Sequence, residues 1–506
     1  MKVGEFDFGA EDARYLRLRS PEQKTRFVDS FVIPKSFKID DFFLGDKFFI
    51  YGPKGSGKTA LLQYIKLNAE KEKNATTGFY YFQSSFSEEE LKLFLQKKRT
   101  NEVVVDDIVP VSVDEGRIFW RIFILMQVAK FLNQAGVTEG PVSEFIRLVE
   151  AAKLISKGHN IVSKYPALQK FSVTLSRDPK INFEGTFENA TPADLNTYIE
   201  LAENSLDQVY IRQCPLFLFI DEMETYVKGD SSDELRLSAI ASLVRAVRDF
   251  NERYRDSDIR VIAAIRDAVV NEVSVVQGEV YRIIRDNGVE LDWSSTIDSL
   301  AFHPLEKMAL NRIATQDPEL SPYTIPISNR ILRHSREKYF PEQFSLRSCL
   351  NLTWFRPRDM ALLLEEARKI DVEQKHFQFN TLKYRILKPL GKRMWQDALS
   401  GLAIKYKPVE MNGIDRILRG GPAIYSRDQL LSRLDDLSEQ YDDVAFLSDN
   451  KWMEVIEDLY KVGVLYVVSP ENSHKNFSFR GDPMPSISAQ FDVGIHQILT
   501  KELALT

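Results

Sequence analysis

The sequence has little of what marks a secreted or membrane protein. Its 506 residues include only two cysteines, Cys214 and Cys349, which is too few for a disulfide framework and predicts a reducing compartment. No apolar run is long enough for a membrane-spanning helix, and residues 1–20 lack the apolar segment of a secretion signal. We therefore expect a soluble, cytoplasmic protein that has no membrane partner.

Signatures of metal sites and of serine hydrolases are also missing. The six histidines are scattered, and no two of them have the spacing that places both ligands on one face of a helix. No G-x-S-x-G sequence is present to suggest a nucleophilic serine. Hydrophobic residues make up 44% and charged residues 28% of the chain, which excludes disorder and fibrous repeats. The net charge of −6 argues against a protein that binds polyanions over its whole surface.

What is present is a glycine-rich motif between a candidate strand and a candidate helix. Residues 52–59 fit G-x-x-x-x-G-K-[ST], with an apolar run at 48–51 before them and a helical pattern from Lys58. In such a loop the backbone N–H groups and the helix N-terminus attract phosphates, Lys58 reaches the β- and γ-phosphates, and Thr59 binds Mg²⁺. The alternative is an ordinary glycine turn. The predicted nucleotide-binding residues are Gly52, Pro53, Lys54, Gly55, Ser56, Gly57, Lys58, Thr59 and Ala60.

Two carboxylates follow another candidate strand. Residues 217–220 are continuously apolar and lead into Asp221 and Glu222, so the run predicts a strand that is buried on both faces. Asp221 would hold Mg²⁺, and Glu222 would polarise the attacking water. The alternative is that Asp221 only caps the next helix.

A cation ends a third apolar run. Residues 261–265 are followed by Arg266, and a cation at the tip of the strand beside the Asp221 strand would face the γ-phosphate and distinguish ATP from ADP. The alternative is a surface arginine at a strand end. The cofactors implied are ATP and Mg²⁺. The predicted catalytic residues are Glu222, Lys58 and Arg266, and the predicted metal ligands are Thr59 and Asp221.

Together with Trp-Phe-Arg-Pro-Arg-Asp-Met at residues 354–360, these motifs resemble the AAA+/STAND branch of P-loop ATPases, and more narrowly the bacterial ATPases described as origin-recognition-like. The resemblance covers about residues 30–400. It implies that an arginine at the start of a lid helix reaches the nucleotide, and Arg358 matches that position first and Arg356 second. A cation on a mobile lid closes on ATP and opens after hydrolysis. The alternative is that Pro357 starts the helix and both arginines form surface salt bridges.

The resemblance and the alternation of strands with helices predict the fold class. We expect an α/β protein with a three-layer parallel-sheet P-loop ATPase core, a helical insertion, an all-α lid and a C-terminal winged-helix-like domain. The expected boundaries are a lead-in segment at 1–45, the ATPase core at 46–299 with its insertion at about 87–210, the lid at 300–411 and the winged-helix-like domain at 412–506.

The insertion is expected because the stretch between Lys58 and Asp221 is longer than a plain core of this family needs. Its apolar helix, at residues 119–132, is interpreted as a core element, with a partner surface as the alternative. The resemblance also implies self-association, in which a neighbouring copy supplies an arginine finger. Arg282 and Arg285 are candidates by position alone, and the alternative is a solvated helix face.

The charge of the C-terminal segment argues against DNA binding. A winged helix that binds DNA carries positive charge on its third helix and wing, but residues 412–506 contain nine lysines and arginines against fifteen aspartates and glutamates. We therefore favour a contact with a protein in this segment.

The function that follows is an ATP-binding and -hydrolysing molecular switch. No effector module is visible in the sequence, so the chain would regulate a separate protein effector in a bacterial system, and the family suggests antiviral defence as the setting. Two alternatives stay open. One is a DNA-binding initiator or loader ATPase that uses the winged helix, and the other is a nucleotide-locked scaffold that does not hydrolyse ATP.

Overall fold

The structure is a computed structural model in which the chain forms two compact units. The sheet unit contains Ser36–Pro53 and Lys58–Leu291, and the helical unit contains Met1–Lys35, Lys54–Gly57 and Asp292–Thr506. Among the described residues no helix is both long enough and apolar enough to cross a membrane. The described residues are 1–10, 12–16, 18–34, 37–81, 113–136, 140–151, 192–209, 215–222, 232–294, 302–320, 328–340, 346–378, 385–403, 405–448, 452–468, 474–484 and 491–506.

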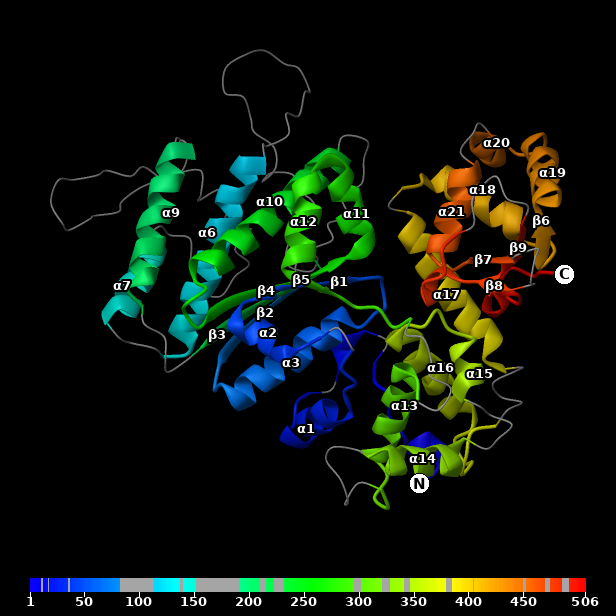
Figure 1. The fold of residues 1–506 in the computed structure, drawn as a ribbon, viewed down its shortest axis with the longest axis horizontal. Helices are drawn as coiled ribbons and strands as arrows, with labels where there is room; N and C mark the ends of the chain where they lie inside the picture. Colours follow the sequence, from blue (N-terminus) through cyan, green and yellow to red (C-terminus); the bar gives the residue numbers. More distant parts are fainter. Residues whose placement is uncertain are drawn as a thin grey trace, which may run out of the picture. The chain divides into compact units, whose positions relative to one another are not determined.

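The sheet unit is built on five parallel strands in the order β2-β3-β4-β1-β5 (Figure 1). The strands are β1 (Phe49–Gly52), β2 (Thr76–Tyr81), β3 (Leu216–Asp221), β4 (Ile259–Arg266) and β5 (Gly288–Glu290). All six residues of β3 and seven of the eight in β4 are buried, as expected for strands that are covered on both faces. The predicted α/β class and its parallel sheet are therefore confirmed.

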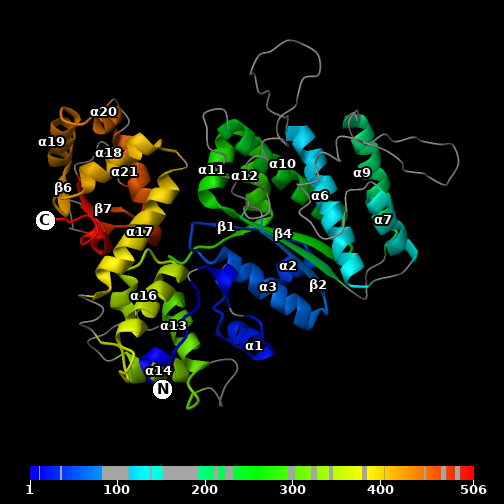
Figure 2. The ribbon, with the colours of Figure 1, turned by 180° about the vertical axis from the view of Figure 1, so that it is seen from behind.

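Helices lie on both faces of this sheet, which gives three layers (Figures 1 and 2). On one face lie α2 (Ile39–Leu44) and α3 (Lys58–Glu72). On the other lie α10 (Ser232–Arg253), α11 (Asp267–Val276) and α12 (Gly278–Asp286). The crossover helices satisfy the connection that parallel strands require.

Three further helices come from the predicted insertion: α6 (Val113–Gln134), α7 (Gly140–Ala151) and α9 (Pro192–Asp207). Helix α6 belongs to the same hydrophobic core as the sheet and α10. The indole of Trp120 is fully buried and donates to the backbone oxygen of Ala239 at 3.1 Å. The structure thus supports the interpretation of this helix as a core element. The other residues of the predicted insertion, 87–112, 137–139, 152–191 and 210, lie outside the described residues.

The helical unit has one hydrophobic core that runs from Val3 to Leu503. Phe6 and Phe8 at the N-terminus are fully buried, and their rings lie against Tyr339 and Phe377 at 4.9 and 5.9 Å between centroids. The segments predicted as lead-in, lid and winged helix therefore share a core. The helices are α1 (Pro21–Ser30), α13 (Pro304–Ala314), α14 (Asn329–Tyr339), α15 (Leu346–Leu350), α16 (Pro357–Ile370), α17 (Leu387–Leu402), α18 (Pro408–Leu418), α19 (Arg427–Ser438), α20 (Asp442–Ser448) and α21 (Trp452–Lys461).

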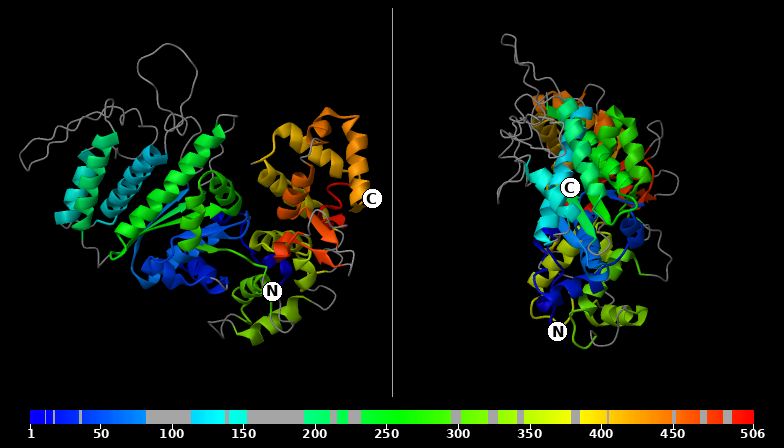
Figure 3. Two further views of the ribbon diagram at one scale, coloured as in Figure 1. Left: turned by 45° about the horizontal axis from the view of Figure 1, so that its top comes forward. Right: turned by 90° about the vertical axis from the view of Figure 1, so that its left-hand side faces the viewer.

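The C-terminal segment also contains a small antiparallel sheet, drawn orange to red in Figure 3, in the order β6-β9-β7-β8. The sequence predicts a hairpin in this segment, with arms at 464–468 and 476–480. The first arm contains β7, and the second arm is short because β8 is followed by a 3-10 turn at Ser478–Arg480. Strands β6 and β9 and helix α20 were not expected from the sequence, and the winged-helix assignment stays a prediction. The strands are β6 (Ile424–Ser426), β7 (Leu465–Val468), β8 (Lys475–Asn476) and β9 (Asp492–Ile495).

His496 is a buried histidine in this core. It is 2% exposed, and its ring lies 6.5 Å from that of Trp354 and 5.6 Å from that of Phe479 between centroids. Burial lowers the pKa of His496 to about 3, and the positive charges of Arg480 and Lys475 act in the same direction. The folded state therefore holds this imidazole uncharged at neutral pH.

We expect His496 to make the helical unit sensitive to acid. The unfolded chain binds a proton at this histidine below pH 6.5, whereas the folded chain does so only near pH 3, so stability falls by about 1.4 kcal/mol per pH unit in that window. In His496→Asn the side-chain oxygen can replace Nδ1, which accepts the N–H of Ile498 at 3.4 Å. Chemical denaturation at pH 7 and pH 5 should show a smaller pH effect in the variant, and the same effect in both proteins would contradict this prediction.

Candidate functional site

The ends of three neighbouring strands gather the predicted residues of the sheet unit. Gly52 at the end of β1 pairs in register with Arg266 at the end of β4. On the other side of β4, Ile220 pairs with Ala263, so Asp221 ends β3 at the same edge of the sheet. Parallel strands leave their carboxyl ends on one edge, which is where open α/β sheets bind ligands.

The glycine loop and the start of α3 have the backbone that a phosphate-binding loop needs. Gly55 and Gly57 have φ values of +85° and +93°, a left-handed conformation in which a side chain is strained. Helix α3 begins at Lys58, as predicted, and the Lys58 ammonium donates to the backbone oxygens of Gly52 at 2.9 Å and Pro53 at 3.0 Å. Its charge is therefore held over the first two residues of the loop, and Thr59 stands beside it in the first turn of the helix.

Asp221 and Glu222 lie directly after the buried strand β3. Asp221 is 3% exposed, and its Oδ1 accepts the N–H of Glu222 at 2.9 Å. Glu222 is half-buried and has φ +59°, which is uncommon for a residue with a side chain and costs of order 1–3 kcal/mol. Strained positions of this kind concentrate at functional sites.

Two oxygen-bearing side chains, those of Thr59 and Asp221, are of the kind that binds Mg²⁺ together with phosphate. Mg²⁺ in nucleotide sites takes one or two protein ligands and completes its shell with phosphate oxygens and water. The Thr59 hydroxyl and the Asp221 carboxylate are ligands of this kind. Within the described ranges no group of three or more His, Cys, Asp or Glu side chains could hold a metal without such help.

The tip of the loop makes its contacts in the helical unit. We call Lys54, Gly55, Arg358 and Asp397 the loop-tip cluster. The backbone N–H of Arg358 donates to the oxygen of Gly55 at 3.3 Å, and a β-carbon on Gly55 would lie 3.0 Å from the Arg358 Nε. Asp397 of α17 forms ion pairs with both cations, through Oδ1 to Lys54 at 2.9 Å and through Oδ2 to Arg358.

The loop-tip cluster contains only one of the two arginines that were predicted at the start of a lid helix. Arg356 is the N-cap of α16 and lies over the ring of Trp354 at 4.9 Å, whereas Arg358 in the first turn contacts the loop. Asp359 beside them is fully buried and accepts the N–H of Trp354 at 3.2 Å. Burial raises the pKa of Asp359, although the charges of Arg356 and Arg358 oppose that shift.

Two residues that touch the loop tip were not predicted from the sequence. Trp293 donates from its indole nitrogen to the backbone oxygen of Ser56 at 2.9 Å, and Asp397 carries the ion pairs described above. Neither belongs to a motif, and both lie hundreds of residues from the loop. The side chain of Ser56 is fully buried, and its hydroxyl has no hydrogen-bond partner among the described residues.

The two candidate finger arginines lie on the exposed face of α12 in the sheet unit. Arg282 has a side chain that is 84% exposed, and its Nε is 3.8 Å from Asp286 one turn later. Arg285 is also exposed. A neighbouring copy could be reached from such a face, and the finger role stays a prediction.

We expect the strain at Glu222 to be measurable. Asparagine tolerates a left-handed backbone better than glutamine does, so Glu222→Asn should be more stable than Glu222→Gln by about 0.5–1 kcal/mol. Both variants lack the carboxylate, which leaves the backbone preference as the main difference between them. Urea denaturation of the pair measures this difference, and a less stable Asn variant would show that the left-handed conformation does not persist.

No protein-family model and no curated protein matches the chain. The interpretation of the site therefore depends on its own residues and their geometry.

Proposed function

We propose that this protein is a Mg²⁺-dependent ATPase that acts as a molecular switch, with ATP bound at residues 52–60. The observation that carries the proposal is the register of the sheet. Gly52 of β1 pairs with Arg266 of β4, and β4 also pairs with β3, which ends at Asp221. A glycine loop, a helix N-terminus, an acid and a cation at one edge are the components that phosphoryl transfer uses.

The role of each side chain follows from its chemistry. The loop N–H groups would bind phosphate oxygens, and Lys58 would exchange its two carbonyl acceptors for the β- and γ-phosphates. Thr59 and Asp221 would hold Mg²⁺, which supplies charge neutralisation when bound. Glu222 would accept a proton from the attacking water, and Arg266 would stabilise charge on the γ-phosphate.

The order of the strands supports the AAA+/STAND interpretation. One strand, β4, lies between the strand that precedes the loop and the strand that ends in the acid pair. Arg266 at its tip therefore lies between these two groups, and we propose that it distinguishes ATP from ADP there.

The loop-tip cluster suggests how the switch works. Asp397 uses its two carboxylate oxygens on two cations, Lys54 and Arg358, and phosphate oxygens are acceptors of the same kind. We infer that Asp397 competes with ATP for both cations. The start of α16 would then have two states, one in which Arg358 is paired with Asp397 and one in which it is paired with phosphate.

The proposed partners are further copies of this chain and a protein effector of a bacterial system, with antiviral defence as a setting.

Contacts in the C-terminal segment favour a protein partner over DNA. Lys461 on α21 lies 3.7 Å from Glu457 and 3.6 Å from Asp458. Arg480 lies over the ring of Phe477 at 4.5 Å and donates to Asn351 at 3.0 Å. These two bases have partners within the protein and are poorly placed for phosphates, so the DNA-binding initiator remains only an alternative.

Replacing Lys58 with alanine should abolish ATP hydrolysis. The loss of the charge that meets the β- and γ-phosphates should lower the Mg²⁺-dependent rate by about 100-fold or more. Lys66→Ala is the matched control, because Lys66 lies on the same helix and pairs with Glu70. Phosphate release measured with and without Mg²⁺ tests this prediction, and equal rates in the wild type and Lys58→Ala would rule out the ATPase.

Glu222→Gln should bind ATP without hydrolysing it, whereas a non-hydrolysing scaffold would keep its function in that variant.

Replacing Asp397 with asparagine should strengthen nucleotide binding. It removes two partly buried ion pairs. A net gain of about 1 kcal/mol for the cations that are released predicts about fivefold tighter binding of a fluorescent ATP analogue. Asp443→Asn is the control, since that carboxylate pairs with Arg416 at 3.1 Å and contacts no residue of the loop-tip cluster. Weaker binding by Asp397→Asn would mean that the carboxylate positions Arg358 for ATP instead of competing with it.

A further inference from the structure

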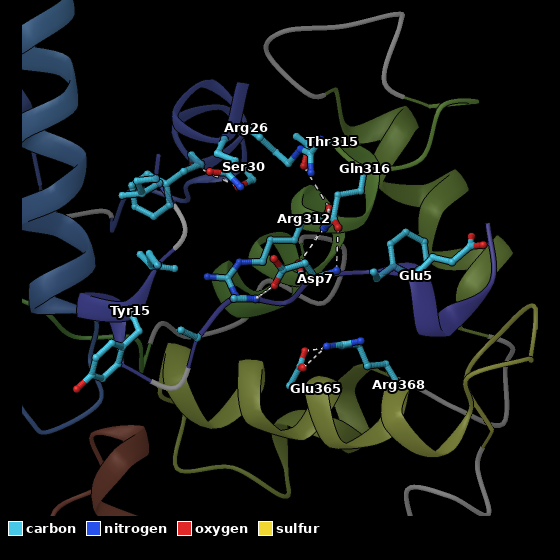
Figure 4. A pocket seen from close by; sticks show the side chains of 17 residues that line it. Glu5, Asp7, Tyr15, Arg26, Ser30, Arg312, Thr315, Gln316, Glu365 and Arg368 are labelled. Carbon is cyan, nitrogen blue, oxygen red and sulfur yellow. Dashed lines mark hydrogen bonds and ion pairs between the residues drawn. The ribbon is translucent and has the colours of Figure 1, made fainter. Parts of the chain in front are cut away.

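A cavity of about 480 Å³ lies in the helical unit, between the N-terminal segment and helices α1, α13 and α16 (Figure 4). Its volume is in the range of small-molecule sites in proteins. Charged side chains and apolar side chains such as Phe27 and Leu18 share its walls. None of the residues proposed to bind ATP lines it, so its occupant does not depend on the proposed function.

The N-terminal segment is a well-anchored wall of this cavity. The side-chain amide of Gln316 pairs with both backbone groups of Asp7, at 2.8 Å to its N–H and 2.9 Å to its oxygen. The N–H of Val3 donates to the oxygen of Gln374 at 2.8 Å. Because these bonds and the buried ring of Phe8 hold the segment in place, the cavity is part of the folded core and is not a gap beside a loose terminus.

Arg312 of α13 is a cation in this cavity for which no ion pair is found among the described residues. Its Nη1 is buried and has no hydrogen-bond partner among the described residues. Gly9 lies close against this guanidinium, because a β-carbon on Gly9 would lie 3.1 Å from the Arg312 Nη1. Burial lowers the pKa of Arg312 to about 10, and only the charge of Asp7 acts against that shift, so the guanidinium stays charged at neutral pH.

The other arginines of the cavity differ from Arg312. Arg368 is satisfied by Glu365, through Nε to Oε2 at 2.6 Å, and by the oxygen of Gly4 at 3.2 Å. Arg26 on α1 is exposed, and it also lines the cavity. Arg312 is half-buried, but its Nη1 is enclosed without a hydrogen-bond partner among the described residues. An anion bound there would give this charge a counter-ion.

We propose that this cavity binds a small organic oxyanion, whose phosphate or carboxylate oxygens accept hydrogen bonds from Arg312 and Arg26. A guanidinium presents parallel N–H donors that match two oxygens of such a group. The rest of the ligand lies against Phe27, Leu16 and Leu18, which line the same cavity. The site is a place where a metabolite could bind to the helical unit and bias its stability.

The experiment measures the melting temperature of the full chain with inorganic phosphate or acetate, each against sodium chloride at equal ionic strength. At ten times its dissociation constant the bound anion should raise the melting temperature by about 3 °C, and the more effective probe identifies the oxyanion. The rise should persist in Lys58→Ala, which removes the lysine of the proposed ATP site, and in Arg330→Gln, which removes an exposed arginine of α14. It should disappear in Arg312→Gln, which is expected to fold because it replaces a half-buried cation by a neutral side chain of similar length.

Two results would overturn the proposal. One is the absence of any rise over chloride with either probe. The other is a rise that disappears in Lys58→Ala and persists in Arg312→Gln, because phosphate would then be bound at the glycine loop.

Arg26→Gln gives a second measurement, on an exposed residue whose substitution is not expected to disturb folding. It should raise the half-saturating concentration of the probe by about threefold or more, and an unchanged value would exclude Arg26 and the site as proposed.

Discussion

The parallel pairing of β1 with β4 is the constraint on which the candidate site depends. Because the two strands run in the same direction and in register, the glycine loop after Gly52 and the cation Arg266 leave the sheet at one level. Strand β3 is joined through β4 and brings Asp221 to that edge. The register is held by apolar side chains that are buried on both faces of the sheet. The packing of the core therefore sets the spacing of the polar groups, and a substitution of a buried residue in β4 would shift Arg266 at the end of that strand.

Local pattern was sufficient to predict the groups at this edge and insufficient for what surrounds them. Apolar runs that end in Asp221 or Arg266 indicate buried strands and their carboxyl ends, and a loop of glycines before Lys58 indicates a phosphate cradle. Asp397 could not be found in this way, because its partners Lys54 and Arg358 lie on other elements and an ion pair across the chain leaves no periodic signal. The same holds for Trp293, which reaches the loop through one hydrogen bond.

The N-terminal and C-terminal segments also contain features that sequence patterns could not predict. Residues 1–45 alternate apolar clusters with polar turns and were expected to form only a lead-in, yet Phe6 and Phe8 are fully buried. Their partners Tyr339 and Phe377 are more than three hundred residues away, so tertiary packing alone gives these short clusters a place in a core. The second arm of the hairpin was expected to be longer than β8 because Phe477 and Phe479 suggest a strand, but both rings pack around His496 from a turn.

The composition of the helical unit has a consequence for the order in which the chain folds. Its first 35 residues must wait for partners that begin at Asp292, whereas the sheet unit has almost all of its residues between these two segments. On the ribosome the sheet unit can therefore fold first, while Phe6, Phe8 and α1 stay exposed on the nascent chain for many seconds at ordinary elongation rates of about 5–20 residues per second. During synthesis the rings of Phe6 and Phe8 therefore wait without the aromatic partners that bury them fully in the finished protein.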